Sequence, residues 1–188
     1  MALRIKSHWS NPERARALDE IAGALAFIAW RIALDRAINL HCARFAYRDD
    51  AQRLAVIEEY LVFLIQIADR LAHTRLDEER RRILITGLAR RVFDHVQDNA
   101  TDLLGPGAHG AAFIERLNTR SGDYAEYGFT DEGPSYPWFR HLGFEIQRLM
   151  GEGQENRWVI DQVMDQDGWE AYRRFARAFA DLFESELD

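Results

Sequence analysis

Apolar residues recur along most of the chain at intervals of three and four positions, which is the period of an amphipathic helix. The longest such pattern begins at Ser10, where Ser-Asn-Pro-Glu is a typical helix start, and a helix is expected from there to about Tyr47. It carries two apolar rows: Leu18, Ile21, Leu25, Ile28 and Ile32, and then Phe27, Trp30, Leu34 and Ile38. A helix with two apolar rows contacts neighbours on both sides, as a central helix of a bundle does.

Turn-forming residues divide the rest of the chain into further helical segments. After Asp49 and Asp50, which can cap a helix, the expected segments are 51–73, 78–104, 111–127, 138–150, 155–166 and 169–186. No stretch alternates between polar and apolar residues in the way that half-buried strands require. The pattern therefore predicts an all-α fold, a helical bundle of six to seven helices with a long first helix. A single domain is expected over residues 1–188, with an N-terminal tail at 1–10 and an ordered surface loop at 128–137.

The balance of charge narrows the range of partners. With 24 basic and 31 acidic residues the net charge is −7, which favours solubility and opposes binding to nucleic-acid phosphates. Cys42 is the only cysteine, so an internal disulfide is excluded and a reducing compartment is indicated. The N-terminus lacks a signal-peptide pattern, and the longest apolar runs are shorter than the roughly 20 residues that cross a bilayer. We therefore expect a soluble, cytoplasmic protein with no transmembrane segment and no nucleic-acid partner.

Familiar metal and phosphate motifs are missing from the chain. Di-iron bundles need Glu-x-x-His pairs and many zinc hydrolases need His-Glu-x-x-His, and neither pattern occurs. A Gly-Lys-Ser/Thr phosphate loop is also absent, and Gly105-Pro-Gly107 is typical of a helix stop. We therefore expect no metal and no cofactor.

The most suggestive polar group on an apolar helix is Asp69, Arg70 and His73. Asp69 and His73 are four residues apart and therefore share a helix face. Such a pair can bind a metal or transfer a proton, but it also forms common capping and salt-bridge pairs near a helix end. Asp35 enters the core-facing row of the first helix, where it either lines a cavity with Asp69 or marks the point at which the helix leaves the core.

The most distinctive segment combines polar and aromatic residues at regular spacing: Asn118, Arg120, Tyr124 and Tyr127, followed by Trp138 and Gly143. Together with Asp69-Arg70 and Glu79-Arg80, this segment resembles a set of uncharacterised bacterial all-helical proteins, over about residues 58–150. The resemblance implies a shared helical fold and carries over no activity and no cofactor. The polar side chains can bind a ligand, or they can hold the 128–137 loop, whose backbone needs hydrogen-bond partners.

Three functions from different classes are compatible with these patterns. The first is a non-enzymatic interaction or scaffold protein that acts as a homodimer through its apolar helix faces. The second is a small-molecule binder or enzyme with a polar pocket inside the bundle, lined by Asp35, Asp69, Arg70, His73, Asn118, Arg120, Tyr124 and Tyr127. The third is attachment to a membrane surface through the arginines of the third helix, although acidic neighbours such as Glu78 and Glu79 are more typical of a solvated face.

Overall fold

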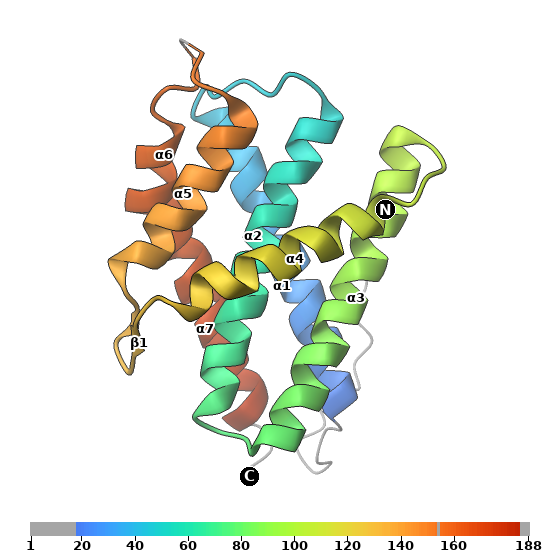
Figure 1. Ribbon diagram of the computed structural model, residues 1–188, viewed down its shortest axis with the longest axis vertical. Coiled ribbons are helices and arrows are strands. Elements are labelled where there is room, and N and C mark those ends of the chain that lie inside the picture. The colour runs from blue at the N-terminus through green and yellow to red at the C-terminus, as the bar shows by residue number, and fades with distance from the viewer. Residues whose placement is uncertain (1–17, 154, 185–188) are drawn as a thin grey trace.

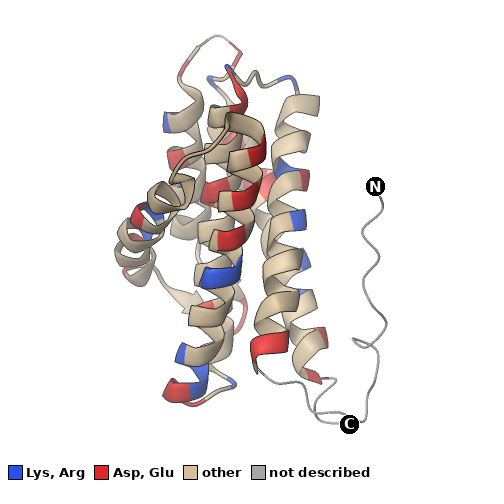
Figure 2. Cartoon of the chain, turned by 90° about the vertical axis from the view of Figure 1, so that its right-hand side faces the viewer, with Lys and Arg blue, Asp and Glu red and all other residues tan. Residues whose placement is uncertain are grey.

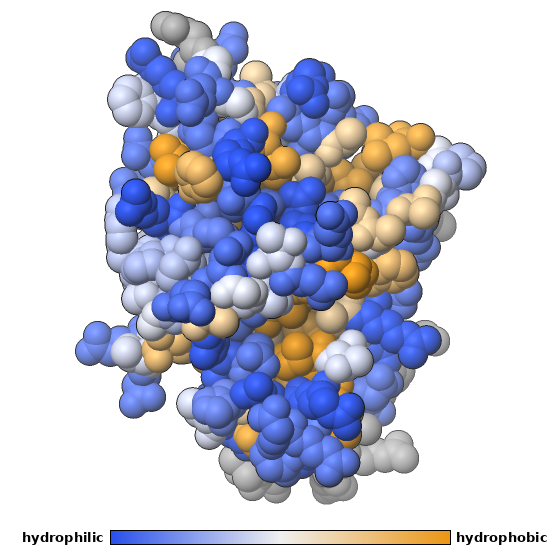
Figure 3. Space-filling model, viewed as in Figure 1, coloured by the Kyte–Doolittle hydropathy of each residue, from blue (hydrophilic) through white to orange (hydrophobic). Residues whose placement is uncertain are grey.

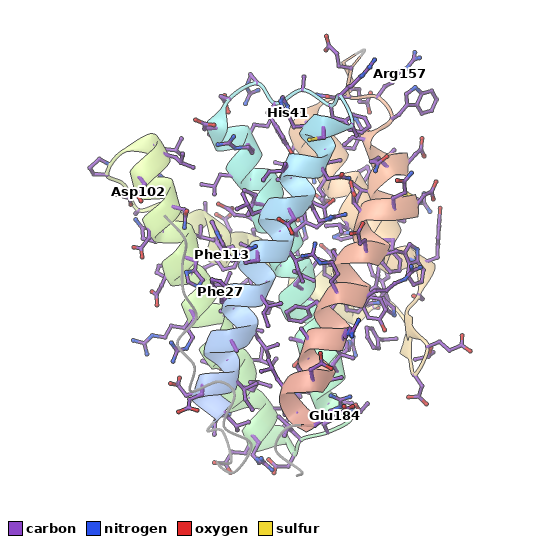
Figure 4. All side chains as sticks on the ribbon, turned by 180° about the vertical axis from the view of Figure 1, so that it is seen from behind. Phe27, His41, Asp102, Phe113, Arg157 and Glu184 are labelled. Atoms are coloured by element: carbon purple, nitrogen blue, oxygen red, sulfur yellow. The ribbon has the colours of Figure 1, made fainter. Side chains whose placement is uncertain are left out.

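In the computed structural model, which describes residues 18–153 and 155–184, the chain is a bundle of long antiparallel helices (Figure 1). Helix α1 covers Leu18–Cys42, α2 covers Asp50–His73 and α3 covers Glu78–Leu104. Helix α7, Gly168–Glu184, runs beside α1 on the rear face, as Figure 4 shows, and also packs on α2. The predicted all-α bundle with a long first helix is thus confirmed.

Small side chains bring α1 close to its three neighbours, α2, α3 and α7. Its buried face is built mainly from alanine: Ala22, Ala26, Ala29, Ala33 and Ala37 are all fully buried. The second apolar row is only partly in contact with the core, since Ile38 is 50% exposed. The expected beginning of this helix at Ser10 lies outside the described residues, as does the predicted tail at 1–10.

Helix α1 ends at Cys42, before the expected Tyr47. The backbone of Arg44 is left-handed (φ 73°), and the Arg44 amide donates to the carbonyl of His41, so the helix cannot continue. Cys42 is exposed at this end. The row that contains Asp35 therefore leaves the core near the end of the helix.

Helix α2 is the centre of the bundle, because it contacts α1, α3, α4, α5 and α7. Asp49 caps its first turn by accepting a hydrogen bond from the Gln52 amide (2.7 Å). Residues 56–65 are all buried, as the continuous apolar run predicts. Even so, no helix in residues 18–153 and 155–184 is both long and apolar enough to cross a membrane.

Helix α4, His109–Ala125, crosses the front of the bundle obliquely, over α2 and α3 (Figure 1). Its first turn comes so close to α3 that a Cβ atom at Gly110 would collide with the ring of Phe93. The helix is continuous through Ser121 and Gly122. The crossing leaves room for hollows on both sides of α4.

The predicted surface loop at 128–137 contains a small hairpin, so the expectation of no strands is wrong at this point. Strands β1 (Phe129–Thr130) and β2 (Gly133–Pro134) pair antiparallel. Phe129 holds the hairpin against α5 and α7 through the rings of Trp138 (centroids 5.5 Å apart) and Tyr172 (6.4 Å). Two-residue strands are too short to show any alternation in the sequence.

The C-terminal third forms the remaining layer of the bundle. Helix α5 covers Tyr136–Met150, and α6 (Val159–Gln162) continues through a π-helical segment, η2 (Val163–Asp167), into α7. The predicted interruption between residues 166 and 169 is therefore a change of helix type and not a break. The stacked rings of Phe139 and Trp169, with centroids 4.1 Å apart, join α5 to α7.

Candidate functional site

Two arginines of α4 reach into the bundle and meet two glutamates of α2. Glu59 is 1% exposed and accepts hydrogen bonds from Arg116 Nη1 (2.8 Å) and Arg120 Nη2 (3.0 Å). Arg116 Nε also lies 3.3 Å from Glu58 Oε2. These buried ion pairs fix the angle at which α4 crosses α2.

Helix α5 adds a third buried carboxylate to the same group. Glu145 accepts hydrogen bonds from Arg120 Nη2 and from Arg148 Nη1, the latter at 2.8 Å to Oε2. Arg120 therefore bridges α2 and α5, one residue serving both Glu59 and Glu145. We call these six residues the carboxylate–arginine network: Glu58, Glu59, Glu145, Arg116, Arg120 and Arg148.

Burial and ion pairing shift the pKa values of the network residues in opposite directions. Burial raises the pKa of Glu58, and the charge of Arg116 only partly offsets this. For Arg120, burial by itself would lower the pKa, but the hydrogen bond and charge of Glu59, together with Glu145, raise it above its usual value. Arg120 is therefore held in its charged form by two carboxylates, each of which it shares with a second arginine: Glu59 with Arg116 and Glu145 with Arg148.

A hollow of about 380 Å³ lies between α4 and α5, and residues of the network form much of its lining. We call it the α5-side hollow; it is lined by Glu59, Ala112, Glu115, Arg116, Thr119, Arg120, Glu145, Arg148 and Leu149. Its three arginines face three glutamates, so its lining carries no net charge.

A second hollow of about 380 Å³ lies on the other side of α4, between α2 and α3. This α3-side hollow is lined by Gln66, Asp69, Arg70, His73, Arg81, Ile85, Ser121 and Ala125. Arg81 of α3 joins the two α2 residues that the sequence spacing placed on one face: its Nε lies 3.3 Å from Asp69 Oδ1 and its Nη1 2.8 Å from His73 Nδ1. Apolar surface is visible in this region, below α4 between α2 and α3 (Figure 3).

Arg70 lies between the α3-side hollow and the end of α4. Its Nη2 donates to the carbonyls of Tyr124 (3.4 Å) and Ala125 (3.3 Å), the last residues of that helix. Its guanidinium carbon also lies 6.0 Å from the ring centre of Trp138. A cation at the negative end of a helix dipole stabilises that end, so Arg70 caps α4.

The two tyrosines of the distinctive segment belong to an aromatic cluster and line neither hollow. Tyr124 is buried, with its ring 4.7 Å from that of Trp138 and 5.0 Å from that of His141. Burial raises the pKa of its hydroxyl, so Tyr124 stays protonated. Tyr127 is half-buried, and its hydroxyl is 3.3 Å from His141 Nδ1.

The predicted polar pocket is therefore divided. Asp69, Arg70 and His73 share the α3-side hollow, whereas Arg120 lines the α5-side hollow. Asp35 lies elsewhere, paired with Arg174 of α7 (2.9 Å), because its part of α1 faces α7 and not α4. Asn118 is on the exposed face of α4.

The alternative role of this segment, holding the 128–137 loop, is also not what the hydrogen bonds show. Arg120 binds carboxylates of α2 and α5, and the hairpin is held by Phe129. The segment ties helices to each other.

A further buried polar group was missed by the sequence analysis. Asp167, 1% exposed at the end of η2, accepts hydrogen bonds from Arg36 Nη1 (3.2 Å) and Asn39 Nδ2 (2.8 Å) of α1. Burial raises the pKa of Asp167, although Arg36 opposes the shift. The only sequence signal for this group was that Arg36 stands among the alanines of the buried face of α1.

The outward face of α5 repeats aromatic and basic residues at every fourth position. Tyr136, Arg140, Phe144 and Arg148 are all exposed, and so are Arg157 and Trp158 of the following connection. Phe144 is 51% and Trp158 59% exposed. The Arg148 guanidinium lies 5.9 Å from the ring centre of Phe144, and that of Arg157 lies 5.1 Å from Trp158. We call these six residues the aromatic–arginine face.

A groove of about 540 Å³ runs along this face, lined by Phe144, Gln147, Arg148, Gly151, Glu152, Arg157 and Ile160.

Within the described residues, no group of three or more His, Cys, Asp or Glu side chains is placed to hold a metal ion. Comparisons of this chain with protein-family models, with curated proteins and with solved structures gave no match.

Proposed function

We propose that this is a helical interaction protein that docks through its aromatic–arginine face, and that its partner is a second copy of the same chain. The observation that carries the proposal is the composition of this exposed face. Tyr, Trp, Phe and Arg are the residues enriched at the energetic centres of protein interfaces, whereas Lys and Glu are depleted there. Phe144 and Trp158 are both large and more than half exposed, and exposed apolar side chains of this size on a surface mark interaction sites.

The carboxylate–arginine network supports this role by holding α5 in place. Arg120 ties α5 to α2 and α4 through Glu145 and Glu59. An interface on a helix that is already fixed loses less conformational entropy on binding than one on a mobile helix. The aromatic–arginine face is thus already fixed in position before a partner binds.

The chain offers a complementary surface of its own on the opposite side of the bundle. Asp94, Asp98 and Asp102 are exposed at every fourth position along α3, and none of them forms an ion pair within the described residues. Figure 2 shows these acidic bands along the upper half of that helix. Leu103 and Leu104, which follow them, are 46% and 42% exposed.

The two surfaces match in spacing as well as in charge. Eight helical residues span about 12 Å, so Arg140 and Arg148 are as far apart along α5 as Asp94 and Asp102 along α3. Apolar side chains accompany both rows: Phe144 and Trp158 on one side, Leu103 and Leu104 on the other. Figure 4 labels Asp102 and Arg157 at opposite sides of the molecule.

Surfaces on opposite sides generate head-to-tail contacts. Each copy then uses its α5 face toward one neighbour and its α3 face toward the other, which produces a ring or an open chain. The proposal therefore replaces the two-fold dimer of apolar helix faces with a heterologous assembly. Membrane attachment through α3 has less support, because three aspartates share that helix with the arginines.

A pair of surface variants tests the proposal by sedimentation velocity and native mass spectrometry. Arg140→Glu with Phe144→Ser removes the α5 face, and Asp94→Arg with Asp98→Arg reverses the α3 face. We expect the wild type to associate at micromolar concentration, each variant alone to be monomeric, and an equimolar mixture to form a one-to-one complex through the intact faces.

The matched control is Arg82→Glu with Ile83→Ser, which makes the same chemical changes at exposed positions near the start of α3. This control should associate like the wild type. A wild type that stays monomeric would contradict self-docking. Dimers that persist in the α3 variant and are lost in the α5 variant would instead show that two α5 faces meet.

A further inference from the structure

We infer that the α3-side hollow binds a small anion, a carboxylate or a phosphate group. The inference is independent of the docking proposal, because none of the residues that line this hollow belongs to the aromatic–arginine face or to the acidic row of α3. It rests on three features of the lining: the supply of hydrogen-bond donors, the net charge and the volume.

The hydrogen bond between Arg81 and His73 fixes the tautomer of the imidazole. A guanidinium can only donate, so His73 Nδ1, 2.8 Å from Arg81 Nη1, must accept. The neutral ring then carries its proton on Nε2 and presents an N–H group. His73 is exposed at the rim of the hollow, where this donor can reach a ligand.

Arg70 contributes a charge that no carboxylate neutralises. Its partners are two backbone carbonyls at 3.3–3.4 Å, and in the part of the chain that the structure describes no carboxylate lies within ion-pair distance of it. A guanidinium has five N–H donors in a planar fork, so Arg70 keeps donors for a ligand after capping α4.

The charge of the lining favours an anion. Within the lining, Arg70 and Arg81 face one carboxylate, Asp69, which Arg81 already engages at 3.3 Å; the second carboxylate near Arg81, Glu78 at 3.6 Å, is 79% exposed and does not line the hollow. The α5-side hollow, with its equal numbers of arginines and glutamates, has no such excess. Of the two hollows, the α3-side hollow is therefore the one that attracts negative charge.

The size of the hollow limits the ligand. A volume of about 380 Å³ is at the lower end of the range for small-molecule sites. Ile85 and Ala125 offer a short apolar wall next to the donors. A small organic acid or a phosphate monoester fits this combination of charge, volume and wall.

The test is a titration of the intact protein, at constant ionic strength held with sodium chloride, with inorganic phosphate in one arm and acetate in the other. Backbone amide shifts in NMR spectra report on the binding. We expect saturable shifts at Gln66, His73, Ser121 and Ala125 with at least one of the two probes, and the arm that saturates at the lower concentration identifies the preferred anion.

Two variants are expected to change the binding affinity in opposite directions, which makes the test more stringent. Arg70→Gln should weaken the binding at least tenfold, whereas Asp69→Asn should tighten it several-fold, because it removes the carboxylate of the lining and leaves Arg81 with only the exposed Glu78, 3.6 Å away, as an acidic partner. Arg82→Gln, at an exposed position next to Arg81, is the control and should bind like the wild type. Shifts that do not saturate with either anion, or equal affinities in all variants, would overturn the inference.

Discussion

On the α5 side of α4, three carboxylates meet three guanidiniums, and the innermost carboxylate, Glu59, is 1% exposed. On the α3 side, Asp69, Arg81 and His73 form a similar chain of contacts, but the side chains of Asp69 and Arg81 are 32% and 23% exposed. The two hollows have the same volume and flank the same helix. They differ in how much water reaches their charges.

That difference decides what the charged groups can do. A fully buried ion pair cannot be opened without leaving a charge unpaired in a medium of low dielectric, so it acts as a permanent link. A partly exposed pair gains less from its Coulomb interaction, because water and salt screen it, and its members can exchange partners. The α5-side network therefore holds the structure, and the α3-side residues remain open to a ligand.

The largest expected effect is the loss of Glu59. Glu59→Ala leaves Arg116 with Glu58 and leaves Arg120 with Glu145 and the partly exposed Asp123, so the buried carboxylate that both arginines share is lost, and we expect the free energy of unfolding to fall by about 3–5 kcal/mol. Urea denaturation followed by circular dichroism measures this. Glu115→Ala removes an exposed carboxylate from the lining of the same hollow and should change stability by less than about 0.5 kcal/mol. Equal effects of the two substitutions would contradict the structural role of the network.

A smaller effect is expected from the helix cap in the α3-side hollow. Arg70→Gln removes two long hydrogen bonds to the end of α4 and a favourable charge at the helix dipole, which together contribute about 1 kcal/mol. Hydrogen exchange should become faster in the last turn of α4, and exchange in the core of α2 should change only with global stability. Unchanged exchange at Tyr124 and Ala125 would show that Arg70 does not cap the helix.

Asp69→Asn should cost still less, under about 1 kcal/mol, because its partner Arg81 is partly exposed. The same measurement in high salt sharpens the contrast between the hollows. Salt should reduce the difference between wild type and Asp69→Asn, but it should leave the effect of Glu59→Ala nearly unchanged, since screening does not reach a buried pair. A strong salt dependence of the Glu59 effect would mean that water enters the network.

Much of the fold could be predicted from local signals in the sequence. The Asp49 cap and the Gly105 stop act within a few residues, so the bounds of α2 and α3 follow from the sequence alone. The end of α1 was placed too late, because the left-handed Arg44 carries no glycine or asparagine signal. The hairpin at Phe129 depends on contacts with α5 and α7 and not on its own pattern.

The candidate site could be predicted only where it lies on one helix. Spacing places Asp69 and His73 on the same face of α2, but their partner Arg81 follows from the packing of α2 against α3. The partnership of Arg120 with Glu59 depends on the oblique crossing of α4, which no periodicity encodes. Asp167 could not be found by helical spacing because a π-helical turn shifts the register just before it.

The smallest expected effect is a pH dependence at His141, which lies next to Tyr124 and Tyr127 in the aromatic cluster. Burial lowers the pKa of His141, and Asp123, 3.5 Å away, offsets this only in part. The unfolded chain, with a histidine pKa of about 6.5, therefore takes up a proton at higher pH than the folded protein. Stability from this group is complete above about pH 7 and is lost as the pH falls through the lowered pKa.

Urea denaturation between about pH 7.5 and about pH 5.5 tests this for the wild type and for His141→Gln. The variant should lose less stability than the wild type as the pH falls, and part of the decline should remain because burial also lowers the pKa of His95. Glu58 and Asp167, whose pKa values burial raises, act in the opposite direction in both proteins, so the difference between the two curves isolates His141. His41→Gln, at an exposed position, should follow the wild-type curve. If His141→Gln followed it as well, water would have to reach the aromatic cluster, which would then be less dry than the packing of Tyr124 implies.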